Sequence, residues 1–294
     1  MIPAPMSPRR DSPGRRLLAA LAHPDDESFG MGGTLALYAQ RGAEVQLVCA
    51  TRGEAGTVAP EKLHGHADIA ALREAELHCA AEMLGLAAVH FLEYRDSGMA
   101  GSPDNADPRA LAAAPVSDVA ARLVRRIREL RPQVVLTFDP RGGYGHPDHV
   151  AMHQATVRAF HLAADPAYPD SQLPAYAPQK LYFQVFPWMN LQWFRWLLPL
   201  LGLNPRRFGR NADIDLLEIA RVAFPTHAQI DIRTSLPAKQ KASECHSSQG
   251  RLFSGGLAAR ILRPSLSVES FMLGHPAAPL GLSESDIFEG ITLD

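Results

Sequence analysis

Two short clusters in this 294-residue sequence place imidazole and carboxylate groups at close spacing. The first is His-Pro-Asp-Asp-Glu, from His23 to Glu27, and the second is His-Pro-Asp-His, from His146 to His149. Side chains of these types bind metal ions and transfer protons. Unpaired carboxylates beside a buried strand lower the stability of the fold or become protonated. A bound metal ion is the simplest way to balance their negative charge. The two clusters therefore predict a metal centre.

His23 and Asp26 are three residues apart in the first cluster, and His149 closes the second. Two imidazoles and one carboxylate can form a tripod that leaves a position for water, as in catalytic zinc sites. The same ligands suit Fe²⁺, so we expect Zn²⁺ with Fe²⁺ as the alternative. Such an ion lowers the pKa of water and provides a nucleophile at neutral pH.

The residues next to these ligands could carry the proton transfers. Asp25 is placed to act as the base. His146 is placed to donate to an oxyanion or a leaving amine, with Asp148 holding its tautomer and favouring the imidazolium. The alternative is that Asp25 and its acidic neighbours only cap a helix, and that the histidines are solvated. Because both clusters lie between an expected strand and an expected helix, we favour the chemical interpretation.

Strands and helices alternate through the first half of the chain. Apolar runs predict strands at 17–22, 44–50, 89–92 and 133–138, and helical spacing predicts helices at 34–41, 67–84, 116–130 and 149–163. This alternation predicts an α/β, Rossmann-like three-layer fold with a mostly parallel sheet. Ligands bind such sheets at the carboxyl ends of the strands, where both clusters fall.

The pattern is looser in the second half, where we expect strands at 180–186, 229–232 and 265–272 and a helix at 236–249. We expect residues 1–16 to be a disordered leader and residues 17–294 to be a single domain. In that domain, 165–294 would close the pocket of the 17–164 core. The segment with Trp188, Trp193 and Trp196 fits a lid, a core wall or an interface, and a structural or homo-oligomer role is the preferred interpretation.

The composition excludes several classes of protein. A net charge of −2 with 20% charged residues argues against a nucleic-acid partner. No apolar stretch is long enough for a transmembrane segment, and the N-terminus has no apolar signal region. Cys49, Cys79 and Cys245 are far apart and odd in number, so we expect no disulfide framework, no thiolate zinc site and a cytoplasmic location. We expect Cys49 and Cys79 to be small buried residues.

The two clusters also resemble a known family. Ala-His-Pro-Asp-Asp-Glu ending at Glu27 and Gly-His-Pro-Asp-His ending at His149 are similar to motifs of the PIG-L/LmbE-like N-deacetylases. These are metal-dependent enzymes that remove acetyl from N-acetylglucosamine-containing compounds, including those of mycothiol, bacillithiol and glycosylphosphatidylinositol synthesis. The resemblance covers residues 17–163.

The resemblance implies roles for individual residues. It makes Asp25 the general base and His146 the acid or oxyanion stabiliser, oriented by Asp148. Tyr144 would reach over the site, and Arg73 and Asp96 would contact the sugar. The metal ligands that it implies are again His23, Asp26 and His149.

We therefore expect a zinc-dependent hydrolase that removes an N-acetyl group from a small N-acetylglucosamine-containing molecule and releases acetate. One alternative is an amidase that acts through the same centre on a bulkier N-acyl or thiol-conjugate glucosaminide. The other is a sugar- or membrane-binding module without catalysis, against which the complete set of site residues argues.

Overall fold

The computed structural model describes residues 14–63, 65–169, 173–185, 204, 206, 222–249 and 267–293. The strands in these ranges are β1 (Arg16–Leu21), β2 (Glu44–Cys49), β3 (Ala88–Phe91), β4 (Val134–Phe138), β5 (Lys180–Val185), β6 (Ala228–Asp231) and β7 (Val268–His275). The α-helices are α1 (Asp26–Phe29), α2 (Gly32–Gln40), α3 (Ile69–Leu84), α4 (Val116–Leu130), α5 (Pro147–Ala164) and α8 (Leu236–Cys245). Among these residues, no helix is long and apolar enough to cross a membrane.

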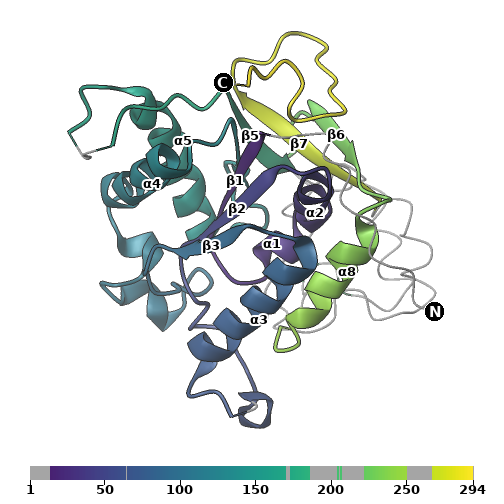
Figure 1. The fold of residues 1–294 in the computed structure, drawn as a ribbon. Coiled ribbons are helices and arrows are strands. Elements are labelled where there is room, and N and C mark those ends of the chain that lie inside the picture. The colour runs from purple at the N-terminus through teal and green to yellow at the C-terminus, as the bar shows by residue number, and fades with distance from the viewer. Residues whose placement is uncertain are drawn as a thin grey trace, which may run out of the picture.

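The described strands form one seven-stranded sheet in the order β3-β2-β1-β4-β5-β7-β6. Strands β1 to β5 pair in parallel, and β7 runs antiparallel between β5 and β6. Helices α4 and α5 lie on one side of the sheet, and α2, α3 and α8 lie on the other (Figure 1). The expected three-layer α/β fold with a mostly parallel sheet is confirmed.

The central strands β1 and β4 are almost entirely apolar because helices cover both faces of the sheet. In β1, Leu17, Leu18 and Leu21 are each at most 1% exposed, and all five residues of β4 are buried. The first strand ends where this apolar run meets His23. The core therefore extends up to the first polar cluster.

Strand β1 is the topological switch point of the sheet. The chain passes from β1 to β2 and β3 on one side, and later returns to β4 on the other side of β1. The loops after β1 and β4 therefore lie next to each other at the point where the strand order reverses, which is where sheets of this kind bind ligands. The first cluster follows β1 and the second follows β4.

Local sequence signals explain where the helices next to the site begin and end. Asp68 caps α3 by accepting a hydrogen bond from the backbone N–H of Ala71 at 2.8 Å, and Gly85, at φ 75°, ends it. Helix α5 begins with Pro147 in its first turn, where the missing N–H costs nothing. The helix therefore starts two residues before the expected position.

Some expectations differ from the structure. Helix α8 ends at Cys245 instead of Gln249, and the four-residue α1 was not expected. Of the expected 1–16 leader, residues 1–13 lie outside the described residues, while Arg16 already opens β1. Trp188, Trp193 and Trp196 also lie outside the described residues.

The expectation of no disulfide is wrong, because Cys79 on α3 is bonded to Cys245 at the end of α8. Spacing along the sequence could not reveal this pair, since the two cysteines are 166 residues apart. The packing of α3 against α8 brings their Cα atoms to 5.9 Å, within the usual range for a disulfide. Cys79 is exposed instead of buried, whereas Cys49 is a buried free thiol as expected.

Candidate metal centre

Potential ligand atoms of three residues meet between the loops that follow β1 and β4. Nδ1 of His23 lies 3.3 Å from Nε2 of His149 and 3.6 Å from Oδ2 of Asp26, whose Oδ1 is 3.3 Å from Nε2 of His149. Bonds of about 2.0–2.2 Å to one tetrahedral ion place two ligand atoms about 3.3–3.6 Å apart. The separations between the residues therefore fit three ligands of one ion, with each imidazole measured to a different oxygen of Asp26. These are the three residues predicted from the sequence.

Each imidazole makes a hydrogen bond through its other nitrogen, and this bond leaves the first nitrogen free to bind a metal ion. Nε2–H of His23 donates to Oδ2 of Asp148 at 3.0 Å, and Nδ1–H of His149 donates to the carbonyl oxygen of Gly142 at 3.1 Å. These bonds place the protons on the outer nitrogens, so the lone pairs of His23 Nδ1 and His149 Nε2 face each other. Outer hydrogen bonds of this kind are typical of metal-binding histidines.

The charges around His23 favour a cation at this place. Carboxylate oxygens of Asp26, Asp96 and Asp148 lie 3.6, 3.4 and 3.0 Å from its ring nitrogens. Burial alone would lower the pKa of His23, but these carboxylates outweigh it and hold that pKa well above its usual value. Burial would likewise raise the pKa of Asp26, yet the neighbouring His149 and His23 hold it well below its usual value. The donor set thus fits a divalent metal ion.

His146 lies close enough to form an alternative set, since ligand atoms of His23, His146 and His149 all fall within 4.8 Å of one another. However, Nδ1 of His146 accepts the backbone N–H of Asp148 at 3.2 Å. The neutral ring therefore carries its proton on Nε2 and presents a donor, not a lone pair. We prefer Asp26 as the third ligand for this reason.

The structure corrects the expected partnership between Asp148 and His146. Asp148 contacts His146 through its backbone, and its carboxylate bonds to His23 and to both the backbone N–H and the hydroxyl of Ser97. The imidazolium is not favoured, because burial and the nearby His23 and His149 lower the pKa of His146 to about 2. Asp148 does hold the His146 tautomer, but it does so with its N–H.

Replacing Asp148 by asparagine tests the part that its carboxylate has at His23. We expect Asp148→Asn to weaken metal binding by about 10–100-fold, the usual cost of losing an outer partner of a metal-binding histidine. Competition with a chromogenic chelator measures this affinity. Wild-type affinity in the variant would show that the Asp148 carboxylate does not orient His23.

Asp25 lies beside the three potential ligands in a strained backbone conformation. Its φ of 127° is one that non-glycine residues rarely adopt, at a cost of about 1–3 kcal/mol. Its Oδ2 accepts from Arg73 at 3.1 Å and its N–H donates to Glu27 at 2.9 Å. It makes no side-chain capping bond within the described residues, although it is the N-cap of α1. The helix-cap interpretation therefore does not account for Asp25.

The environment of Asp25 suits a base that works near neutral pH. Burial raises its pKa to about 6, with the neighbouring Asp26 adding to the rise and the Arg73 guanidinium opposing it. A carboxylate with a pKa near the working pH is an effective general base.

The three residues that were expected to bind substrate lie in different surroundings. Arg73 is 4% exposed, and its guanidinium donates to the carbonyls of Pro24 and Gly53 as well as to Asp25. It thus supports the Asp25 loop from α3. Asp96, also buried, faces His23, whereas Tyr144 is 37% exposed with its ring 5.1 Å from that of His149. Tyr144 is therefore the one of the three that is open to solvent beside the site.

Gly53 shows how closely the backbone packs around Arg73. It has a φ of +70°, and a Cβ there would lie 2.0 Å from a guanidinium nitrogen of Arg73. A larger residue at this position would displace the side chain that holds Asp25.

Comparison with known proteins identifies the family. The model of the PIG-L family, described as GlcNAc-PI de-N-acetylase, matches residues 18–160. A 1D-myo-inositol 2-acetamido-2-deoxy-alpha-D-glucopyranoside deacetylase of Thermobispora bispora is 38% identical over 94% of this chain and 99% of its own length. The chain belongs to the PIG-L family. A PIG-L relative of the same description in Streptomyces griseus is 39% identical over 96% of this chain and 91% of its own.

A solved structure shares the PIG-L fold. The N,N'-diacetylchitobiose deacetylase of Pyrococcus horikoshii superposes with a TM-score of 0.59 at 22% identity, covering 91% of this chain and 87% of that one. At that identity the likeness concerns the fold. The family resemblance expected from the two clusters is confirmed by the closer relatives.

The sequence analysis assigned no role to several groups that hold the PIG-L site together. Ser97 and the Gly142 carbonyl fix Asp148 and His149, and His246 contacts Glu27 beside the Asp25 loop. Ser97 lies in a polar stretch at the end of an expected strand, which was a signal that could have been used. A backbone carbonyl such as that of Gly142 leaves no signal in the sequence.

Proposed function

We propose that this protein is a metal-dependent N-deacetylase that hydrolyses the acetamide of a small N-acetylglucosamine-containing molecule and releases acetate. The observation that carries the proposal is the tripod of His23, Asp26 and His149, with a base and a hydrogen-bond donor beside it. The relatives from Thermobispora bispora and Streptomyces griseus are described as deacetylases of an inositol 2-acetamido-glucopyranoside. An inositol glucosaminide is therefore our preferred substrate.

We further propose that the ion is Zn²⁺, with Fe²⁺ as the alternative, held by His23, Asp26 and His149. Two imidazoles and a carboxylate suit both ions. When bound, such an ion activates water as a nucleophile and polarises the substrate carbonyl. The chain contributes the orientation of the ligands through Asp148 and Gly142.

Asp25 and His146 supply the proton transfers in this proposal. Asp25, held by Arg73 and Glu27, takes the proton from the attacking water as the new C–O bond forms, and returns it to the leaving amine when the C–N bond breaks. Nε2–H of His146 donates a hydrogen bond to the oxyanion that develops on the acetamide carbonyl. His146 acts here as a neutral donor, since burial holds its pKa far below neutrality.

The remaining residues complete the proposal. We propose that Tyr144, exposed beside His149, contacts the substrate, and that Arg73 and Asp96 act through Asp25 and His23. We also propose that residues 17–294 form a single catalytic domain. Strands β5, β6 and β7 support this, because they extend the same sheet as β1 and β4.

The pH dependence of kcat/KM should report the ionisation of Asp25. A base acts only when deprotonated, so activity should be full above its pKa and fall about tenfold per pH unit below it. The pKa is about 6, and a nearby metal cation favours the carboxylate, so we expect the midpoint at or below pH 6. A midpoint above 7 in a pH–rate profile of the zinc-loaded enzyme would contradict this assignment.

Acetate release from a panel of substrates tests the proposed function. We expect one acetate per free amine from an N-acetylglucosaminyl inositol, and slower release from free N-acetylglucosamine. The same panel should include a glucosaminide with a longer N-acyl chain. Cleavage of the longer amide alone would favour the amidase alternative, and binding without cleavage of any would favour a sugar-binding module.

A further inference from the structure

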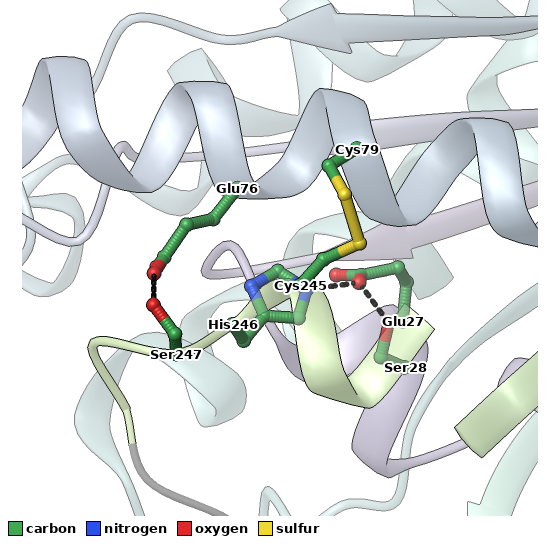
Figure 2. Close-up of a disulfide and its surroundings, with 7 residues drawn as sticks. All are labelled: Glu27, Ser28, Glu76, Cys79, Cys245, His246 and Ser247. Atoms are coloured by element: carbon green, nitrogen blue, oxygen red, sulfur yellow. Dashed lines mark hydrogen bonds and ion pairs between the residues drawn. A yellow bond between two sulfur atoms is a disulfide. The ribbon is translucent and has the colours of Figure 1, made fainter. Parts of the chain in front are cut away.

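The C-terminal end of α8 reaches the loop that carries Asp25. His246, the residue after α8, is fully buried, and its Nε2 donates to Oε1 of Glu27 at 2.7 Å. The other oxygen of the Glu27 carboxylate accepts the N–H of Asp25 at 2.9 Å. Ser28 donates to Oε1 of the same carboxylate at 2.5 Å. Figure 2 shows His246 and Ser28 directed at Glu27.

These bonds form a chain from α8 to the proposed base. Asp25 has a positive φ, and a residue held in such a conformation needs surroundings that impose it. Arg73 holds its carboxylate from α3, whereas Glu27 holds its backbone. Because both the acceptor and the donor in the Glu27–His246 bond are buried, the position of Glu27 depends on its partners.

We infer that His246 is a positioning residue for the proposed deacetylation: through Glu27 it fixes the backbone of Asp25 in the orientation that the base requires. His246 does not touch the three metal-ligand atoms, so its effect should be on kcat and not on metal binding. The inference rests on the proposed function.

Three variants test this role. We expect His246→Ala to lower kcat per bound metal ion by about 10–100-fold, the scale of a small misplacement of a catalytic group, with KM nearly unchanged. His246→Gln keeps an N–H donor and should restore most of kcat. Ser247→Ala is the matched control, because Ser247 bonds to Glu76 at 3.0 Å and not to Glu27.

The kcat values of these variants and of the wild type test the positioning role and the proposed function separately. Equal losses in His246→Ala and His246→Gln, or full kcat per metal ion in His246→Ala, would overturn the positioning role. Either result with an active wild type leaves the deacetylase proposal standing. A wild type that releases no acetate from any substrate in the panel would instead reject the proposed function.

A second, independent observation concerns the disulfide. Cys245 directly precedes His246, and its partner Cys79 lies on α3, one turn beyond Glu76 and two turns beyond Arg73. The bridge therefore ties together the two elements that hold Asp25, namely α3 through Arg73 and α8 through His246 (Figure 2). Cys79 is exposed and Cys245 half-buried, so small thiols can reach the bond.

We propose that this disulfide is a redox-sensitive strap, meaning a covalent link that keeps Asp25 in position only while it is oxidised. Two molecules of a low-molecular-weight thiol would reduce it. The protein gains two thiols and their two protons, and the small thiols are oxidised to one disulfide. Opening the bridge leaves the hydrogen bonds of Ser247 and Ser248 to Glu76 to hold the end of α8 at this part of α3. The His246–Glu27 contact would then loosen, so that deacetylation slows while the metal ligands stay in place.

Titration of thiols in the denatured protein measures the state of the bridge. The oxidised chain should show one free thiol, Cys49, and the reduced chain should show all three cysteines. We expect reduction to lower kcat several-fold with KM unchanged. The double variant Cys79→Ser/Cys245→Ser should have the kcat of the reduced enzyme, and added thiol should not change it. A fall in its kcat on addition of thiol would show that the thiol removes metal.

Equal kcat before and after complete reduction would overturn the strap. So would three free thiols in protein exposed to oxidant, since the bridge would then not form. Both readouts are measured on chains that keep His246, although the proposed effect on kcat acts through the His246–Glu27 contact. The thiol titration is independent of the substrate.

Discussion

Asp25→Asn should retain one metal ion per chain and lose about 10²–10⁴-fold in kcat, the range that general-base catalysis contributes. Asparagine has nearly the shape of aspartate and can still accept a hydrogen bond from Arg73, but it cannot take a proton. The three ligand atoms belong to other residues, so metal content should be unchanged. Acetate release and metal analysis on the same sample measure both quantities.

The residual activity of this variant provides a further check. If Asp25 is the base, the acidic limb of the pH–rate profile should disappear in Asp25→Asn. A variant with wild-type turnover would reject the assignment of Asp25. A variant that lost its metal would show instead that Asp25 belongs to the ligand set.

His149→Ala should lose both the metal and the activity. The substitution leaves two ligands. Its metal affinity should fall by more than the loss of about 10–100-fold that is expected for an outer partner such as Asp148. The ring of His149 also stacks on Phe138 at 4.0 Å, so the variant leaves a gap beside the site. Its stability must therefore be measured separately from its metal binding.

Thermal unfolding with and without zinc separates these effects. Zinc should raise the melting temperature of the wild type, because a ligand that binds the folded chain stabilises it. The melting temperature of His149→Ala should not respond to zinc at the same concentration. A normal zinc response in this variant would exclude His149 as a ligand and favour a set that includes His146.

Much of the fold follows from local pattern. The apolar runs that form β1 and β4 are continuous because both faces of the sheet are covered, and such runs are visible in the sequence. The rule that ligands bind at the carboxyl ends of parallel strands then brings His23 and His149 together, although they are 126 residues apart. The placement of β7 between β5 and β6 depends on long-range pairing and was not predicted.

In the site, too, some features follow from local sequence and others depend on distant parts of the chain. Residue types and spacing led to His23, Asp26 and His149, and the structure brings their ligand atoms together. The direction of each side chain could not be predicted, because it depends on partners from distant elements. Ser97 bonds to the Asp148 carboxylate that contacts His23, and α3 places the Arg73 guanidinium against Asp25.

The disulfide illustrates why spacing rules can fail. Cys79 and Cys245 meet only because α3 packs against α8 (Figure 1), a contact between elements that are far apart in the chain. An odd number of cysteines at wide spacing carries no information about such packing. Tertiary contact, not sequence pattern, decides this bond.

Stepwise addition of Zn²⁺ to metal-free protein, with the rate of acetate release followed at each step, tests the central claim most directly. A single three-ligand centre predicts that the rate rises in proportion to added zinc and stops rising at one equivalent per chain. Deacetylation by metal-free protein at the same rate, or a rate that does not depend on zinc or iron, would contradict the metal centre of His23, Asp26 and His149.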